Sequence, residues 1–239
     1  MYEFERANSS SPHIRTVQRY LKNNSSYLAE GKLMASELRA YLESNNYPLK
    51  ICWSEDATRI TGGIEYRSST DELSGLVAIL DDTTGLPVQG LFSCSTPRMI
   101  IDNIKKYPIG RNVQLAMAQP LTTGAAPFCV LYYCTNNRFD TDSVTKKWAH
   151  VEEMLQKEGI EIVCKATDGD TRFIRAMVDE MEFNKPTEAE FGMWFQANTK
   201  SICVQDPTHL ANKLRNRMMN QKTQLMLGKL CILKLRTVM

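Results

Sequence analysis

Two acidic residues in this sequence lie at the ends of apolar, β-type runs. Asp168 directly follows the run at residues 160–167, and Asp56 lies near the end of the run at residues 49–60. In layered α/β domains, ligand-binding groups collect at the ends of neighbouring strands. Two carboxylates that meet there repel each other unless a cation lies between them, and oxygen ligands of this kind select Mg²⁺ or Mn²⁺. Asp56 and Asp168 are therefore candidate metal ligands, and two such ions can clamp the attacking and leaving oxygens of a phosphodiester.

Each acid also has a plain structural interpretation. Asp168 fits a turn, and Asp170 precedes the helical pattern that begins at Thr171, which makes Asp170 the better helix cap. Glu55 competes with Asp56, because side chains alternate along a strand and one of the two points toward a shared site. Strand-end acids are more often caps and turn formers than metal ligands, so spacing alone leaves both interpretations open.

A third acid begins the helical segment at residues 206–219. Asp206 and the proline after it are a strong helix-start signal, with the aspartate as the cap. His209, Lys213 and Arg217 recur every four residues and share one helix face. His209 can titrate near a site, although a single histidine usually has a plain hydrogen-bonding role. An adjacent stripe is apolar and is expected to pack on the sheet: Leu210, Leu214 and Met218.

Positive charge is concentrated near the C-terminal end of the sequence. The 239-residue chain has a net charge of only +2, yet the stretch from residue 207 to residue 239 holds seven Lys or Arg and no Asp or Glu. Such a stripe attracts phosphate even when the total charge is near neutral, and it is equally compatible with a solvated helix face. The predicted nucleic-acid contacts in this stretch are Lys213, Arg215 and Arg217.

The seven cysteines are scattered, mostly within apolar runs, and none has C-x-x-C spacing. Cysteine in such a run behaves as a small hydrophobic residue, which indicates reduced thiols and no zinc site. No apolar stretch reaches transmembrane length, and the N-terminus has no signal-peptide pattern. We therefore expect an intracellular protein, in the nucleus or the cytoplasm, that does not contact membranes.

The elements that must position these residues follow a mixed α/β order. Helical patterns occur at residues 9–21, 23–46, 97–106, 140–159, 170–181 and 207–219. Apolar runs predict strands at residues 49–60, 62–70, 73–80, 112–121, 127–135, 160–167 and 200–206. This order predicts an α/β fold with a mixed sheet and flanking helices. The expected parts are a helical N-terminal segment at 1–46, a core at 47–220 and a basic tail at 221–239.

Four stretches together resemble the P-element and THAP-domain transposases. They are SPHIRTVQRYL (11–21), DATRITGGIEYRSSTDELSGLV (56–77), TDGDTRF (167–173) and DPTHLANKLRN (206–216). The resemblance implies a ribonuclease H-like core that cleaves DNA and transfers strands with Mg²⁺, with Asp56 as the first catalytic carboxylate and Asp168 as the second. In the family, the last block leads into an inserted domain, and the role of its residues looks mainly structural: Asp206, His209, Lys213, Arg215 and Asn216.

Two features of that family have no counterpart in the sequence. The family's third acid, a Glu on a later helix, is missing because no Asp or Glu follows Asp206, and the zinc-binding THAP module with its Cys-x-Cys is missing at the front. The resemblance therefore predicts a truncated copy, either a weakened DNA-cleaving core or a non-catalytic module that binds DNA or a partner protein. The N-terminal helices are candidates for self-association into a homo-oligomer. An unrelated α/β enzyme is disfavoured, because the sequence has no P-loop, G-x-S-x-G or G-x-G-x-x-G motif.

Overall fold

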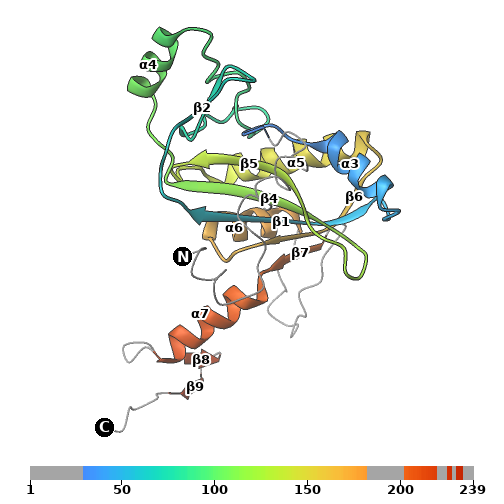
Figure 1. Cartoon of the computed structure of the whole chain (residues 1–239). Coiled ribbons are helices and arrows are strands. Elements are labelled where there is room, and N and C mark those ends of the chain that lie inside the picture. The colour runs from blue at the N-terminus through green and yellow to red at the C-terminus, as the bar shows by residue number, and fades with distance from the viewer. Residues whose placement is uncertain (1–28, 182–201, 220–224, 228–229, 234–239) are drawn as a thin grey trace, which may run out of the picture.

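The computed structural model describes residues 29–181, 202–219, 225–227 and 230–233. Its centre is a five-stranded mixed sheet in the order β5-β4-β1-β6-β7 (Figure 1). Three strands form an antiparallel meander, and β6 and β7 extend the sheet in parallel from β1. A mixed sheet with flanking helices is the α/β architecture that the order of elements predicted, and it is consistent with the ribonuclease H-like core that the resemblance implied. The strands are β1 (Lys50–Arg59), β4 (Asn112–Pro120), β5 (Phe128–Thr135), β6 (Glu161–Thr167) and β7 (Ile202–Gln205).

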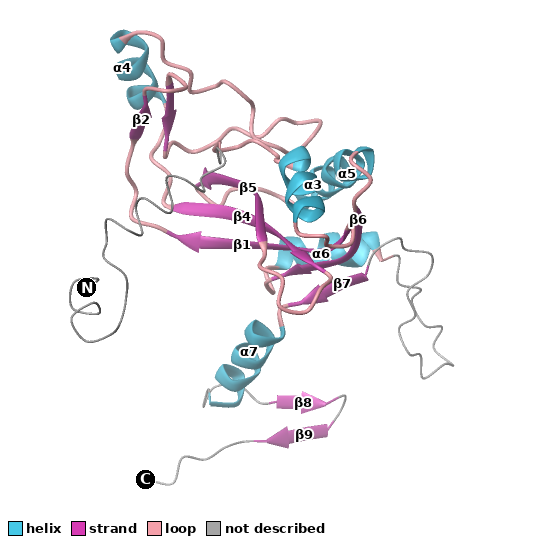
Figure 2. Cartoon of the chain, turned by 45° about the vertical axis from the view of Figure 1, so that its right-hand side comes forward, coloured by secondary structure: helices cyan, strands magenta, loops and turns pink. Residues whose placement is uncertain are grey.

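Three helices pack on one face of the sheet, and two others project away from it (Figures 1 and 2). The packed helices are α3 (Ala35–Ser44), α5 (Thr141–Lys157) and α6 (Thr171–Glu180). The projecting ones are α4 (Pro97–Lys106) and α7 (Pro207–Met219). Two short hairpins lie outside the main sheet: β2 (Glu65–Arg67) with β3 (Glu72–Ser74), and β8 (Leu225–Leu227) with β9 (Leu230–Leu233).

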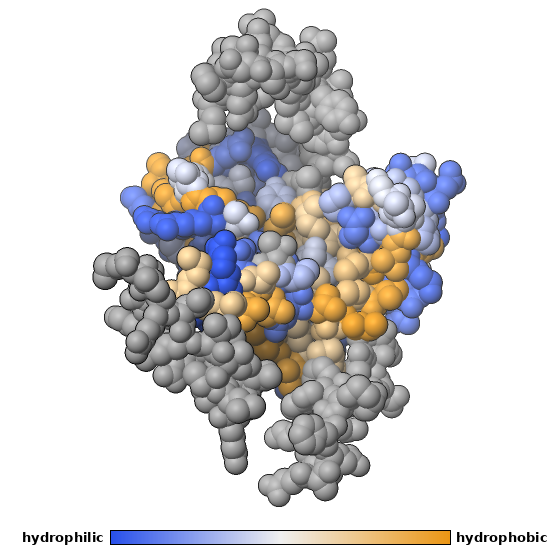
Figure 3. Space-filling model, turned by 90° about the horizontal axis from the view of Figure 1, so that it is seen from below, coloured by the Kyte–Doolittle hydropathy of each residue, from blue (hydrophilic) through white to orange (hydrophobic). Residues whose placement is uncertain are grey.

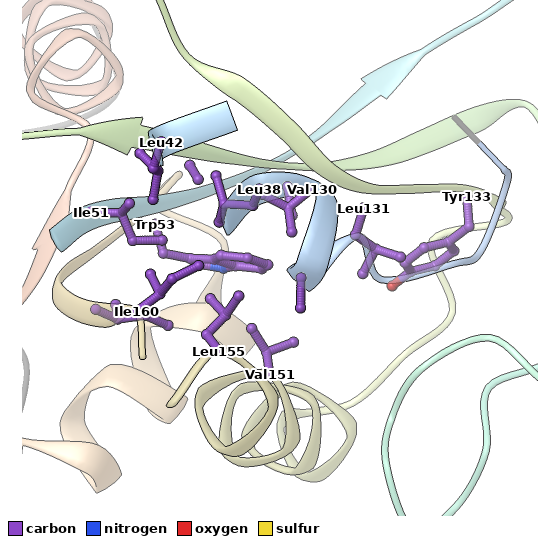
Figure 4. Close-up of a cluster of buried hydrophobic side chains, with 14 residues drawn as sticks. Leu38, Leu42, Ile51, Trp53, Val130, Leu131, Tyr133, Val151, Leu155 and Ile160 are labelled. Atoms are coloured by element: carbon purple, nitrogen blue, oxygen red, sulfur yellow. The ribbon is translucent and has the colours of Figure 1, made fainter. Parts of the chain in front are cut away.

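The main core lies between the sheet and helices α3 and α5. Figure 4 shows Leu38 of α3 and Val151 and Leu155 of α5 gathered around Trp53 of β1, and all four side chains are almost completely buried. The spacing of the two α5 residues places them on one helix face, so a single stripe is removed from water. Full burial of an aliphatic side chain of this size contributes about 1.5–3 kcal/mol. A second cluster joins α5, α6 and β7 around Trp148.

Helix α3 is shorter than the helix predicted at residues 23–46. Residues 29–34 instead run beside β5, where the Gly31 amide donates to the Tyr132 carbonyl at 2.7 Å and the Met34 amide donates to the Val130 carbonyl at 2.9 Å. Gly31 has a φ of 81°, a left-handed conformation that stops a helical path. The helix predicted at residues 9–21 lies outside the described residues.

The strands predicted at residues 62–70 and 73–80 are wrong in extent and place. This region forms the small β2–β3 hairpin, and the sheet takes β4 and β5 as the neighbours of β1 on that side. Gly75 follows β3 with a φ of 91°, and a Cβ there would lie 1.9 Å from the Gly63 carbonyl oxygen. This close backbone approach bends the chain away from the strand direction that the apolar pattern indicated.

The other predicted elements are confirmed to within three residues at each end. Helix α3, from the predicted N-terminal segment, packs into the same hydrophobic core as the sheet. The predicted limits of the three parts of the chain, 1–46, 47–220 and 221–239, stay a prediction. Among the described helices, none is both long enough and apolar enough to cross a membrane.

Candidate active site

The register of the sheet brings the two candidate acids to the same place. β1 and β6 are parallel neighbours, and Glu55 pairs with Thr167. Asp56 and Asp168 each follow by one residue, and neighbouring strands lie about 4.8 Å apart. Both acids line a pocket of about 310 Å³. The start of α7 closes another side of the same pocket with Asp206, Pro207 and His209.

Strand alternation separates Asp56 from its neighbour Glu55. Glu55 points into the core, where its carboxylate accepts hydrogen bonds from the indole nitrogens of Trp53 (2.8 Å) and Trp148 (3.0 Å). It also accepts from the amide of Gln114 (3.2 Å) and the ammonium of Lys147 (2.5 Å). A buried carboxylate with four donors has no capacity left for a cation, so Glu55 is structural.

The partner of Glu55 in this network is a lysine, Lys147, that is almost completely buried. Burial alone would lower the pKa of Lys147, but the negative charge of Glu55 and the hydroxyl of Tyr133 outweigh it, and the pKa is raised above its ordinary value. Lys147 therefore stays charged, and the ion pair ties α5 to β1 one residue before Asp56.

The loop after β6 shows how the two acids at 168 and 170 divide their roles. The Asp170 carboxylate accepts from the Arg172 amide at 2.9 Å and caps α6, as predicted. Arg172 also pairs with this carboxylate at 2.7 Å, and these hydrogen bonds lower the pKa of Asp170 despite its partial burial. Asp168 Oδ1 accepts from the Asp170 amide at 3.0 Å, so Asp168 forms the turn that the plain interpretation expected.

Both candidate acids keep an oxygen available for a ligand. Asp56 Oδ1 accepts from the Ala57 amide at 2.7 Å, and Asp168 uses one oxygen in its turn. Within the described residues, neither carboxylate has an ion pair within 4 Å. Two such oxygens suit the hard cations Mg²⁺ and Mn²⁺. The described residues contain no cluster of three or more His, Cys, Asp or Glu placed around one ion, so further ligands would come from water or substrate oxygens.

Helix α7 starts at the pocket and then leaves the sheet. The Asp206 amide donates to the Thr167 carbonyl at 2.8 Å, which fixes the start of the helix beside the end of β6. Asp206 directly precedes Pro207, the first residue of α7, and its capping role stays a prediction; its carboxylate lies 3.8 Å from Nδ1 of His209. His209 thus lines the pocket, while its predicted plain hydrogen-bonding role and its proton-transfer role both stay untested.

The outer part of α7 corrects one prediction. The stripe expected to pack on the sheet is largely exposed, with Leu210 at 54% and Leu214 at 48% exposure. The helix meets the sheet at its first turn and then projects from it (Figure 2), so its direction carries the stripe away from the apolar surface.

The predicted nucleic-acid residues on α7 differ in what they contact. Arg215 and Arg217 are exposed side chains on the projecting helix. Lys213 instead reaches back to the loop after β6, where its ammonium donates to the Gly169 carbonyl at 2.5 Å. A Cβ on Gly169 would meet that ammonium at 2.2 Å, so the glycine makes room for the lysine. No local sequence pattern indicates this contact, because it joins residues that are 44 positions apart.

Two hydrophobic residues of β4 that line the pocket were not predicted from the sequence. Leu115 and Met117 of β4 line the pocket. The antiparallel register pairs Leu115 with Asp56 and Met117 with Ser54 of β1. The alternation of β4 was visible in the sequence, but the face that meets the pocket depends on its pairing with β1. Figure 3, seen from below Figure 1, shows apolar side chains gathered across this side of the molecule.

Comparison with known proteins gives a match to a solved structure and none by sequence. The sequence matches no family model and no curated protein. Among solved structures, the chain is similar to the Drosophila P element transposase strand transfer complex, with a TM-score of 0.45 and 16% sequence identity. The match covers 91% of this chain and 40% of that chain, so the chain spans less than half the length of the protein it resembles.

Proposed function

We propose that this chain is a transposase-derived, ribonuclease H-like core whose Asp56 and Asp168 bind Mg²⁺ or Mn²⁺ and act on phosphodiester bonds of DNA. One observation carries the proposal: two acids that are 112 residues apart in sequence, Asp56 within β1 and Asp168 directly after the neighbouring parallel strand β6, line one pocket. The sequence blocks that resemble P-element transposases contain both of these acids and Asp206.

The residues around the pocket have distinct tasks in this proposal. Asp56 and Asp168 hold the cation, which would supply charge stabilisation for an attacking or leaving oxygen when bound. Lys213, held on the Gly169 carbonyl, adds positive charge beside the pocket where a DNA phosphate would approach. The buried Glu55–Lys147 pair fixes the strand that carries Asp56. No third carboxylate takes part in this assignment, so we expect slow cleavage.

Nicking of supercoiled plasmid DNA tests the activity. The wild-type chain should nick DNA with Mg²⁺ or Mn²⁺ and stop when a chelator is added. Asp56→Asn and Asp168→Asn should each reduce nicking to the background rate, because each removes one carboxylate charge from the pocket. Asp142→Asn is the matched control, since Asp142 is an exposed acid on α5 that pairs with Lys146 and does not line the pocket. Full activity in Asp168→Asn would refute the assignment.

Metal binding can be measured without DNA cleavage. Fe²⁺ that replaces Mg²⁺ generates radicals which cut the polypeptide close to the bound ion. We expect cuts near residues 56 and 168, competed by Mg²⁺ and lost in the double variant Asp56→Asn, Asp168→Asn. Cuts spread along the acidic surface of the chain would argue against a defined site.

A non-catalytic DNA-binding module is the second candidate, and exposed cations on α7 favour it. Each phosphate contact made by Lys or Arg adds about one unit to the slope of log affinity against log salt. Replacing Arg215 and Arg217 with Ala should reduce that slope by about two units. Salt-dependent binding without metal-dependent nicking would assign the chain to this second class.

A further inference from the structure

Two cysteines lie side by side on the sheet face that carries the acids. The register of β1 and β6 pairs Cys52 directly with Cys164. Each thiol precedes one of the acids by four residues, Cys52 before Asp56 and Cys164 before Asp168. Because side chains alternate along a strand, residues an even number of positions apart share a face. Ser54 follows Cys52 by two residues on β1, Ala166 follows Cys164 by two residues on β6, and both line the pocket, so the thiol pair lies on the pocket face of these strands.

The two thiols are free and half-buried. Burial raises the pKa of the Cys52 thiol to about 12, and the neighbouring Cys164 thiol contributes to the same shift, so the two sulfurs are close enough to affect each other. Paired residues on neighbouring strands lie about 5 Å apart at their Cα atoms. This spacing is within the range of about 4.4–6.8 Å that disulfides span.

The other thiols on the sheet have no such partner. The register places Cys129 opposite Met117, Cys134 opposite Val113 and Cys203 opposite Lys165. Within the described strands of the main sheet, Cys52 and Cys164 are thus the pair of cysteines in register.

We propose that Cys52 and Cys164 are a dithiol modification site that closes to a disulfide between β1 and β6 by exchange with a small-molecule disulfide such as oxidised glutathione. One cysteine, as its thiolate, attacks the glutathione disulfide, forms a mixed disulfide and releases one reduced glutathione. The second cysteine loses its proton and attacks the protein sulfur of that mixed disulfide, which forms the β1–β6 bond and releases a second reduced glutathione. Two protein thiols are oxidised, and one glutathione disulfide is reduced to two thiols.

The bond would join the two strands that carry the proposed metal ligands. It closes the chain across residues 52 to 164, and therefore across the hairpin, α4, β4, β5 and α5. The inference stands apart from the proposed function, since it concerns the thiols alone.

Mass spectrometry of the native, full-length chain tests the proposal. After incubation with oxidised glutathione at mildly alkaline pH and acid quenching, the main product should have lost two hydrogen atoms and carry no glutathione. Peptide mapping without reduction should recover a cross-linked peptide that contains Cys52 and Cys164, and dithiothreitol should reverse it. Stable glutathione adducts on these cysteines, or a cross-link between other cysteines, would overturn the proposal.

Three serine variants make the test specific. Cys52→Ser and Cys164→Ser should each prevent the cross-link and leave a stable glutathione adduct on the remaining thiol. Cys129→Ser is the matched control, because Cys129 is also half-buried on the sheet but faces a methionine across the register. The control should form the Cys52–Cys164 bond at the wild-type rate. The mapping of the wild-type chain decides the question even where a variant folds poorly.

Discussion

The two faces of strand β1 use the same chemical group in opposite ways. Glu55 faces the helices and is enclosed by two tryptophans, a glutamine and a buried lysine. Asp56 faces the pocket, is exposed and accepts one backbone hydrogen bond. On the helix side the Glu55 carboxylate is held by four donors, whereas on the pocket side a carboxylate oxygen of Asp56 stays open to a ligand.

This contrast shows that residue type does not define a functional acid. Removal of a carboxylate that is fully paired inside the core destabilises the fold, because it leaves a buried partner without a counter-charge. A carboxylate at the mouth of a pocket adds little to the fold and is free to bind. Variants on each face should therefore separate stability from ligand binding.

The largest effect is expected for the adjacent pair of substitutions Glu55→Gln and Asp56→Asn. Glu55→Gln removes the counter-charge of the buried Lys147 and should lower the free energy of unfolding by about 3–5 kcal/mol. Asp56→Asn makes the same chemical change one residue later, at an exposed position, and should alter the free energy of unfolding by less than about 0.5 kcal/mol. Urea denaturation followed by circular dichroism measures both. Similar losses for the two variants would contradict the assignment of the two faces.

A second contrast compares a packed helix with the projecting one. Leu155 of α5 is completely buried, and Leu155→Ala should lower the free energy of unfolding by about 2–5 kcal/mol. Leu214 of α7 is nearly half exposed, and Leu214→Ala should change it by less than about 0.5 kcal/mol. The same urea titration applies. A large loss for Leu214→Ala would mean that α7 packs on another part of the protein.

The cap of α6 gives a smaller effect that sharpens the comparison at the pocket. Asp170→Ala removes the cap hydrogen bond to the Arg172 amide and should cost about 1 kcal/mol. Asp170→Asn keeps a capping oxygen and should cost less than the alanine variant. Thermal unfolding of both variants separates the contribution of the capping hydrogen bond from the contribution of the negative charge of Asp170.

The smallest effect is a change of stability with pH at the same residue. The pKa of Asp170 is lowered in the folded chain by its hydrogen bond to Arg172, so the ionised form stabilises the fold. This contribution is complete above the ordinary aspartate pKa of about 4 and is lost as the pH falls through the lowered folded value. The stability difference between wild type and Asp170→Asn should stay constant from pH 7 to about 5 and shrink below about 4. A difference that grew on acidification would have the wrong sign.

Much of the fold follows from the sequence where local patterns are long. The helix at 140–159 and the strands at 112–121 and 160–167 repeat their apolar residues for many positions, and the structure has them there. The strands predicted at residues 62–80 were wrong in extent and place. Their short apolar runs are interrupted by glycines whose role depends on contacts such as that of Gly75 with Gly63. Short patterns do not determine which strand joins the sheet.

The candidate site was predictable in part, because both acids are linked to long apolar runs. Asp168 and Asp56 follow apolar runs, and parallel pairing of those runs brings their ends together. The choice between Glu55 and Asp56 was left open, since either phase of the strand agrees with the sequence until the helices show which face is covered. The reach of Lys213 to Gly169 depends on the direction of α7, which no local pattern encodes.

The pairing of β1 with β6 also has a consequence for how the protein folds. The register joins Lys50 to Glu161, so the two strands meet across a separation of 111 residues. Contacts this distant in sequence require costly loop closure and slow the search for the native topology. During synthesis, β1 emerges from the ribosome long before β6, and one of its edges waits without its eventual neighbour. A nascent chain at that stage is open to misassembly, and the pocket can form only after most of the chain has been made.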